Sequence, residues 1–360
     1  MLTKRDLMIV SGGKIVRGFD QVSVQFSIDS LFGEFDLTIK RRWTESKDIP
    51  FKIGDPCTIF LSGKHFITGF IDYLSFGFGP DGSSVEIYGR SKSVDAAESC
   101  LELKSNQFRG KQSVKSISDK LLEPFGVSMI AETSIQNEKL EDWKIEPGER
   151  VGDALIRIAK TLRLNLFGLP SGNLFLGKAF QGKAAGWVRQ GDNLEQMDNA
   201  FDGTELFNKY IVRGEKKDSK TAKTKPVKGE TDPDYVRKGR LLVIPYEGLT
   251  DQKKAASLAK WEKQVRHGRA YNVSAVVSGW TNPKTGMPWE VNTLVTVDCI
   301  KASIKKDLLI SEVSFDYNEE QGHTTSLELK HPDSFAPEPP EIKPESKEDH
   351  LKKYGHLING

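Results

Sequence analysis

The chain has 360 residues, with 52 lysines and arginines against 50 aspartates and glutamates, a formal net charge of +2. At this length we expect two to four domains rather than one core. The near balance of charge argues against a dedicated nucleic-acid binder, which needs a basic surplus to release counterions from phosphates. No apolar run approaches the ~18 residues that cross a bilayer, so we expect no membrane insertion.

The first residues, MLTKRDLMIVSGGK, contain an apolar stretch far shorter than that of a signal peptide. We therefore expect the chain to be made and kept in the cytoplasm unless another protein carries it out. The three cysteines, Cys57, Cys100 and Cys299, show no CxxC spacing. Cys57 and Cys299 lie on segments of alternating apolar residues, which predicts buried, reduced thiols there.

Residues 1–97 are predicted to form strands throughout. Apolar and polar residues alternate from Val22 to Ile28 and again from Phe35 to Ile39, the period of a strand with one buried face. Gly79-Pro80-Asp81-Gly82 has the composition of a hairpin turn. Several short strands at this spacing favour a small barrel or a sandwich.

Residues 98–180 change character and predict a small α/β domain. Ser113 can cap a helix that stops at Pro124. Apolar residues at helical spacing from Val151 to Leu162 predict an amphipathic helix. The segment LNLFGLPSGNLFLG then reads as two strands around a turn.

Residues 181–213 are expected to be connecting strands. Residues 214–240 are rich in lysine and poor in apolar residues, which favours a solvated, mobile loop, with a contact arm that orders on an acidic partner as the alternative. Within 241–336 we expect a helix at 250–267, capped by Thr250, followed by a second β module. The Pro- and charge-rich residues 337–360 predict a flexible tail.

The second β module repeats the first in sequence. Four pairs of segments match in the same order, and the spacing between matched residues drifts from 237 to 242, as loop insertions would cause. This pattern predicts an internal duplication, with the repeated aromatic residues as packing landmarks of the core. The matched pairs are Trp43-Thr44 with Trp280-Thr281, Pro50-Phe51 with Pro288-Trp289, Thr58-Ile59 with Thr296-Val297, and Val85-Glu86-Ile87 with Leu327-Glu328-Leu329.

Motifs that would carry chemistry are weak throughout the sequence. Gly77 to Gly82 fits GxGxxG, but a strand follows where a dinucleotide site needs a helix, so the hairpin interpretation is favoured. No GxSxG, GxxxxGK[ST] or HExxH motif occurs, and the histidines have no metal-ligand spacing with a cysteine. We therefore assign no catalytic, cofactor-binding or metal-binding residue. The histidines are His65, His267, His323, His331, His350 and His356.

Several segments, taken in order, resemble a known family. They include IGDPCTIF, TGFIDY, GRSKSVDAAESC, GNLFLG, MPWEVNTLVTV and LLISEVSF. From about Leu7 to His331 the chain resembles the baseplate hub proteins of Mu-like contractile-tailed phages, the tail protein P or late control protein D family.

This resemblance implies a mainly β fold with an α/β insert, in which two similar small β-barrel domains and a small α/β domain assemble as a ring-shaped trimer. It implies a structural, non-enzymatic virion protein of the tail baseplate, assembled in the host cytoplasm. Such a hub joins the sixfold tail tube to the threefold membrane-piercing spike and forms part of the DNA channel, through which DNA passes without specific binding.

The partners that the resemblance implies are further copies of the chain, the spike protein, the tail tube or tape-measure protein and neighbouring baseplate proteins. Two alternatives stay open. One is a tail-associated cell-wall hydrolase, which a catalytic dyad in a cleft would favour. The other is the hub of a prophage-derived contractile injection machine, which shares the architecture.

Overall fold

The computed structural model describes residues 7–41, 50–80, 82–102, 107–180, 182–217, 224–231, 237–337 and 339. The chain is mainly β and divides into two compact units. The larger unit contains Met1–Asp202 and Tyr271–Phe335, and the smaller contains Gly203–Ala270 and Ala336–Gly360. Within the described residues, no helix is both long and apolar enough to span a membrane.

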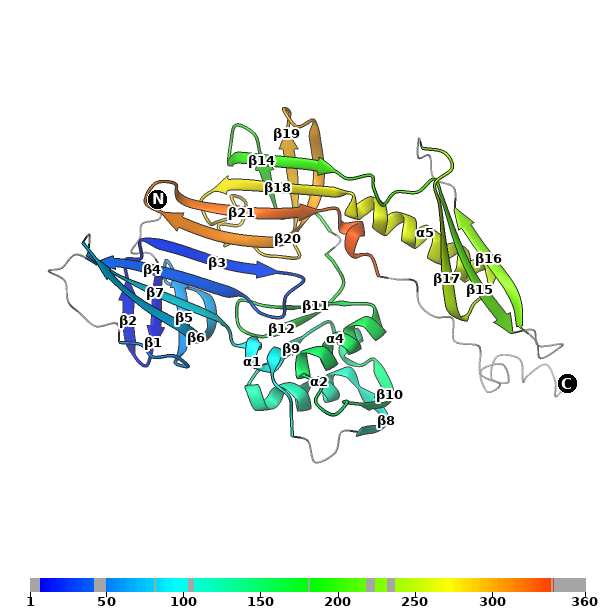
Figure 1. Ribbon diagram of the computed structural model, residues 1–360, viewed down its shortest axis with the longest axis horizontal. Coiled ribbons are helices and arrows are strands. Elements are labelled where there is room, and N and C mark those ends of the chain that lie inside the picture. Colours follow the sequence, from blue (N-terminus) through cyan, green and yellow to red (C-terminus); the bar gives the residue numbers. More distant parts are fainter. Residues whose placement is uncertain are drawn as a thin grey trace. The chain divides into compact units, whose positions relative to one another are not determined.

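Two sets of strands share one 13-stranded sheet in the larger unit (Figure 1). The first set is β1 (Leu7–Ser11), β2 (Lys14–Arg17), β3 (Gln21–Ser27), β4 (Glu34–Arg41), β5 (Pro56–Leu61), β6 (Lys64–Gly79) and β7 (Gly82–Ser91). The second set is β13 (Gly186–Arg189), β14 (Leu194–Phe201), β18 (Tyr271–Ser278), β19 (Leu294–Cys299), β20 (Ile304–Asn318) and β21 (Gly322–Lys330).

The expectation of two closed barrels is not met. The main path of the sheet runs β14-β18-β21-β20-β3-β4-β7-β6-β5-β1-β2, and β19 and β13 branch from β20. The two sets join where β20 pairs antiparallel with β3. One edge of β3 pairs with β4, and its other edge pairs with β20 of the second set, so β3 does not pair with a second strand of its own set. Among the residues described, no strand pair closes either set into a barrel.

The internal duplication recurs in the strand pairing. The order β3-β4-β7-β6-β5-β1 is matched by β14-β18-β21-β20-β19-β13. Both long strands also carry a register shift at the same place, between Ile71 and Tyr73 in β6 and between Ile310 and Glu312 in β20. One feature differs, since β1 pairs antiparallel with β5 whereas β13 pairs parallel with β19.

The register shifts correct one match made from the sequence. When Ile71 is aligned with Ile310, Gly89 aligns with Leu329, and Ile87 aligns with Leu327 rather than Leu329. The sequence match of β7 with β21 was therefore displaced by two residues. A slip of two keeps every side chain on the same face, so alternation alone could not reveal it.

Aromatic residues fill the core where the two sets meet. Trp280 is 1% exposed, and its ring stacks on Phe66 with 6.1 Å between centroids. Phe315 meets Phe66 edge-on at 4.9 Å, and the indole nitrogen of Trp280 donates to the carbonyl of Asp316. The predicted role of Trp280 as a packing landmark is confirmed, as is that of the buried Phe51 and Trp289. Trp43-Thr44 lies outside the described residues.

The α/β segment after β7 has its own apolar core, built on α2 and α4. The Ser113 hydroxyl accepts a hydrogen bond from the amide of Ser116, which confirms the predicted cap, and α2 ends one residue before the 3-10 turn that contains Pro124. The elements are α1 (Ser93–Glu98), β8 (Gln107–Ser113), α2 (Val114–Leu122), η1 (Glu123–Phe125), β9 (Met129–Ile130), α3 (Thr133–Gln136), β10 (Lys139–Lys144), α4 (Val151–Leu162), β11 (Asn165–Gly168) and β12 (Leu174–Gly177).

The smaller unit corrects the prediction of one loop over 214–240. Residues 214–217 and 224–231 of this range lie in strands, because β15 (Lys209–Lys217) pairs antiparallel with β16 (Thr224–Thr231). β15 also pairs parallel with β17 (Leu241–Leu249). Strands form despite the lysines because the buried Tyr210 and Val212 pack against an adjacent helix. Residues 218–223 and 232–236 lie outside the described residues.

That helix, α5 (Gln252–Arg269), packs on β15 and β16 and belongs to the smaller unit, whereas the sequence grouped it with the second β module. Its cap is Asp251, whose carboxylate accepts from the amide of Lys254 at 2.8 Å, and not Thr250 as the sequence suggested. The short turn η2 (Pro332–Phe335) ends the larger unit. Beyond it, the predicted tail lies outside the described residues except at 337 and 339.

Candidate assembly surface

The large sheet has one apolar and one polar face across β3, β4, β7, β20 and β21. The residues between the buried positions of these strands are polar, and many are acidic. Strand pairing places them side by side, with Glu312 opposite Glu328, and Asp316 opposite Ser23. We call the following set the polar face: Gln21, Ser23, Gln25, Glu34, Asp36, Thr38, Glu86, Tyr88, Glu312, Ser314, Asp316 and Glu328.

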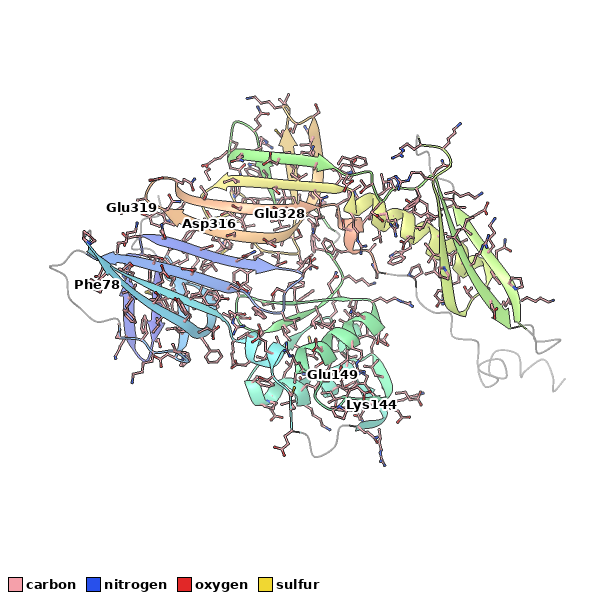
Figure 2. All side chains as sticks on the ribbon, viewed as in Figure 1. Phe78, Lys144, Glu149, Asp316, Glu319 and Glu328 are labelled. Atoms are coloured by element: carbon pink, nitrogen blue, oxygen red, sulfur yellow. The ribbon has the colours of Figure 1, made fainter. Side chains whose placement is uncertain are left out.

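Hydrogen bonds on the polar face connect the two strand sets. Gln25 donates to Glu312 at 2.7 Å, and Ser23 donates to Asp316 at 3.0 Å. Ser274 in β18 donates to Glu328 at 2.5 Å. Figure 2 shows Asp316 and Glu328 on the neighbouring strands β20 and β21. The carboxylates of Glu312 and Asp316 thus connect the two sets, whereas the bond to Glu328 lies within the second set.

A groove of about 500 Å³ lies on the polar face over β3, β4 and β7. Its lining includes Glu34, Asp36 and Glu86. Burial, and then the nearby charge of Glu86, raise the pKa of Asp36. The arrangement is a concave acidic surface, which disfavours the approach of phosphates and offers carboxylates rather than a nucleophile with a base.

The GxGxxG segment forms a hairpin, as its turn composition predicted. β6 ends at Gly79, which pairs with Gly82 at the start of β7. The strand after the turn leaves no helix N-terminus for a pyrophosphate at this position.

The thiols and histidines are not brought together. Cys57 and Cys299 are buried, as expected, whereas Cys100 is exposed. Burial lowers the pKa values of His65, His267 and His331. In the part of the chain that the structure describes, no group of three His, Cys, Asp or Glu side chains could hold a metal ion. His350 and His356 lie outside that part.

One feature of the surface was missed from the sequence. The C-terminal half of β6, from Tyr73 to Gly79, pairs with β7 on one edge, and none of the described strands pairs with its other edge. This half carries exposed aromatic side chains, with Phe76 65% and Phe78 85% exposed. Figure 2 shows Phe78 at the tip of the β6–β7 hairpin. The sequence signal that could have revealed this exposed edge is the alternation of two phenylalanines beside a turn.

A second open edge belongs to β14. It pairs with β18 on one side, and no other described strand continues the sheet beyond it. The strand ends in the half-exposed Phe201. Two edges of the larger unit's sheet, that of β14 and that of the C-terminal half of β6, therefore present backbone groups and exposed aromatic side chains suited to strand addition.

Comparisons with known proteins identify the fold in three parts of the chain. Residues 6–91 match the N-terminal domain of the Mu phage baseplate assembly protein GpP-like family. Residues 95–178 match the second domain of the baseplate hub protein gp44-like family, and residues 251–338 match the fourth domain of Mu phage GpP. The last range runs from α5 of the smaller unit into the second strand set.

Individual proteins agree with these matches. Baseplate hub protein gp44 of Escherichia phage Mu is 26% identical over 337 residues, covering 90% of this chain and 87% of that protein. The 43 kDa tail protein of prophage MuSo2 from Shewanella oneidensis has a TM-score of 0.78 at 26% identity, covering 91% of this chain and 99% of that chain. A tail protein from Neisseria meningitidis shares the fold, with a TM-score of 0.71, 21% identity and coverage of 91% and 98%.

The chain belongs to the Mu-type baseplate hub family. It is a structural component of a phage baseplate and so part of the virion tail. The relatives named above are baseplate and tail proteins, which is consistent with a non-enzymatic role. For a hub, the two open strand edges and the polar face are therefore the surfaces of interest.

Proposed function

We propose that this hub assembles as a homotrimeric ring that joins the sixfold tail tube to the threefold spike. The observation that carries the proposal is the repeated strand order, because one chain with two similar modules presents six modules in a trimer. Closed rings need contacts between unlike surfaces, and the chain offers two different open edges. In this proposal the spike, the tube or tape-measure protein and neighbouring baseplate proteins are the partners, and assembly takes place in the host cytoplasm.

We propose further that the polar face lines the channel through which DNA passes. Its carboxylates repel phosphates, so they offer no site where a moving DNA molecule would be held. Acidic residues in the groove, including the exposed Asp36, keep this character across the first strand set.

The ring is tested by the mass of the full-length protein in solution. Native mass spectrometry over a range of concentrations, with and without the spike, should show a species of three chains of 40.2 kDa each. Electron microscopy of that species should show six similar lobes around a central opening. A dimer, or a trimer without an opening, would contradict the proposal.

The channel lining is tested by charge reversal in the assembled trimer. Changing Glu34, Asp36 and Glu86 to lysine should create salt-sensitive retention of double-stranded DNA on a gel, whereas the unchanged protein should not retain it. A matched variant carries three lysines in place of the exposed Glu138, Glu141 and Glu146 of the α/β segment. Equal DNA retention by both variants would show that the polar face has no special access to DNA.

A further inference from the structure

The contact between β20 and β3 is the starting point, because it joins the two repeated strand sets within one chain. The C-terminal half of β20 pairs with β21 on one edge and with β3 on the other. On this second edge, Val313 lies opposite Phe26, Phe315 opposite Val24, and Tyr317 opposite Val22.

The duplication gives each of these strands a counterpart. Alignment on the shared register shift equates Val313 of β20 with Leu74 of β6, so that Phe315 and Tyr317 correspond to Phe76 and Phe78. All of these side chains are apolar, so β6 keeps the apolar pattern that β20 has where it pairs with β3.

The partner strand also has a counterpart. β3 pairs with β4 as β14 pairs with β18, and Leu37 opposite Val22 corresponds to Ala275 opposite Met197. Continued along the strand, this register equates Phe26 of β3 with Phe201 of β14.

The paired and unpaired copies differ in exposure. Phe315 is 1% exposed in its contact, whereas its counterpart Phe76 is 65% exposed. Phe26 is 4% exposed, whereas its counterpart Phe201 is 55% exposed. Matching residues are thus buried in β20 and β3, which pair with each other within the chain. They are exposed in the counterparts β6 and β14, which have no such partner among the described strands.

We infer that β6 of one protomer pairs antiparallel with β14 of a second copy, reproducing the β20–β3 junction between chains. This inference rests on the proposed ring and specifies its contact. Transfer of the β20–β3 register places Leu74 opposite Phe201 of the neighbour, Phe76 opposite Asn199 and Phe78 opposite Met197. Ser75 then lies opposite Ala200.

The contact is head-to-tail, since each protomer gives β6 on one side and β14 on the other. A chain of such contacts closes into a ring if the rotation permits. Around that ring the junctions alternate, one within each chain and one between chains. The polar face would then continue from protomer to protomer, and the exposed aromatic side chains would be covered.

Engineered disulfides test the register directly. In a Cys100→Ser background, which removes the exposed native thiol, Ser75→Cys and Ala200→Cys are combined in one full-length chain. Directly opposed residues in paired strands approach closely enough for a disulfide. Mild oxidation should therefore give mostly covalent trimers on a non-reducing gel. A mixture of the two single variants should give dimers only, because each chain then has one engineered thiol.

The matched control moves one cysteine along the same strand. Ser75→Cys combined with Gln196→Cys places the thiols four residues out of register, beyond disulfide reach, and should give no cross-link. A second measurement compares Phe78→Asp with Ile300→Asp, two hairpin-tip residues that are 85% and 84% exposed. Phe78→Asp should raise the concentration for half-assembly at least tenfold, and Ile300→Asp should leave it unchanged.

The outcomes separate this contact from the ring itself. A trimer by native mass spectrometry without the Ser75–Ala200 cross-link, and without an effect of Phe78→Asp, would overturn the strand contact and leave the ring standing. Monomers at every concentration, alone and with the spike, would overturn both. Cross-linking of Ser75 with Gln196 in preference to Ala200 would show that the register is wrong.

Discussion

At the scale of single residues, Trp280 packs where the two strand sets meet. Its ring stacks on Phe66 from β6 and lies 6.2 Å from Phe315 of β20, while its indole nitrogen donates to the carbonyl of Asp316. One side chain thus contacts both copies of the repeat and satisfies a backbone acceptor of β20.

We predict that Trp280→Ala lowers the free energy of unfolding of the larger unit by about 3–5 kcal/mol, the usual cost of a buried tryptophan. Chemical denaturation followed by circular dichroism measures this loss. Trp187→Ala serves as the control, because Trp187 is only half-buried and its indole nitrogen bonds to Asp192 at the surface. Equal losses for the two variants would contradict the assigned role.

The cysteines give a second prediction at this scale. Burial, and then the charge of Asp72, raise the pKa of Cys57 to about 12. Because the thiolate is the reactive form, Cys57 should resist alkylation in the folded protein. Iodoacetamide near pH 8 should label Cys100 first, with Cys57 and Cys299 labelled only after unfolding. Rapid native labelling of Cys57 would show that its strand opens readily.

The same shift has a consequence for stability. The folded state binds the Cys57 proton more tightly than the unfolded state, whose thiol pKa is ~8.5. The stabilisation is therefore complete below that pH and is lost progressively as the pH rises towards about 12.

At the scale of elements, the packing of α5 on β16 depends on one glycine. A Cβ atom at Gly229 would lie 2.0 Å from the carbonyl carbon of Ala255 and 2.1 Å from the amide of Ala256. The helix backbone lies directly on the strand there, beside the apolar cluster of Tyr210 and Val212.

We predict that Gly229→Ala forces α5 away from β16 and destabilises the smaller unit by about 1–3 kcal/mol, as overpacking usually does. Hydrogen exchange should rise across the amides of α5 and leave the larger unit unchanged. Lys228→Ala is the control on the same strand, since that side chain is exposed. Unchanged exchange in Gly229→Ala would show that the helix does not need this close approach.

At the scale of the whole molecule, the two compact units have separate apolar cores. One core runs through the shared sheet and a second through the α/β segment, both in the larger unit, while Tyr210, Val212 and Leu258 belong to the core of the smaller unit. Units with separate cores commonly unfold as separate cooperative transitions.

We therefore expect calorimetry of the dilute protein to resolve more than one transition. Trp280→Ala should shift the transition of the larger unit to lower temperature, and Gly229→Ala should shift that of the smaller unit. A single transition that both variants shift equally would show that the units unfold together.

The sequence alone determined the strands of both β sets, the duplication and the helices 114–122 and 151–162. These features depend on local alternation, helical spacing and capping, as the Ser113 cap shows. The sequence also carried the resemblance to phage baseplate hubs, which the comparisons confirm.

Only the tertiary structure decided which strand edges meet. That β3 joins β20, that β6 and β14 keep an open edge among the described residues, and that lysine-rich strands pack under α5 all depend on contacts between segments far apart in the chain. The repeat was visible in sequence, but its register in β7 and β21 was not, because a two-residue slip preserves alternation. Alternation specifies the buried face of a strand, whereas its neighbours are specified by the backbone hydrogen bonds of its edges, which carry no side-chain signal.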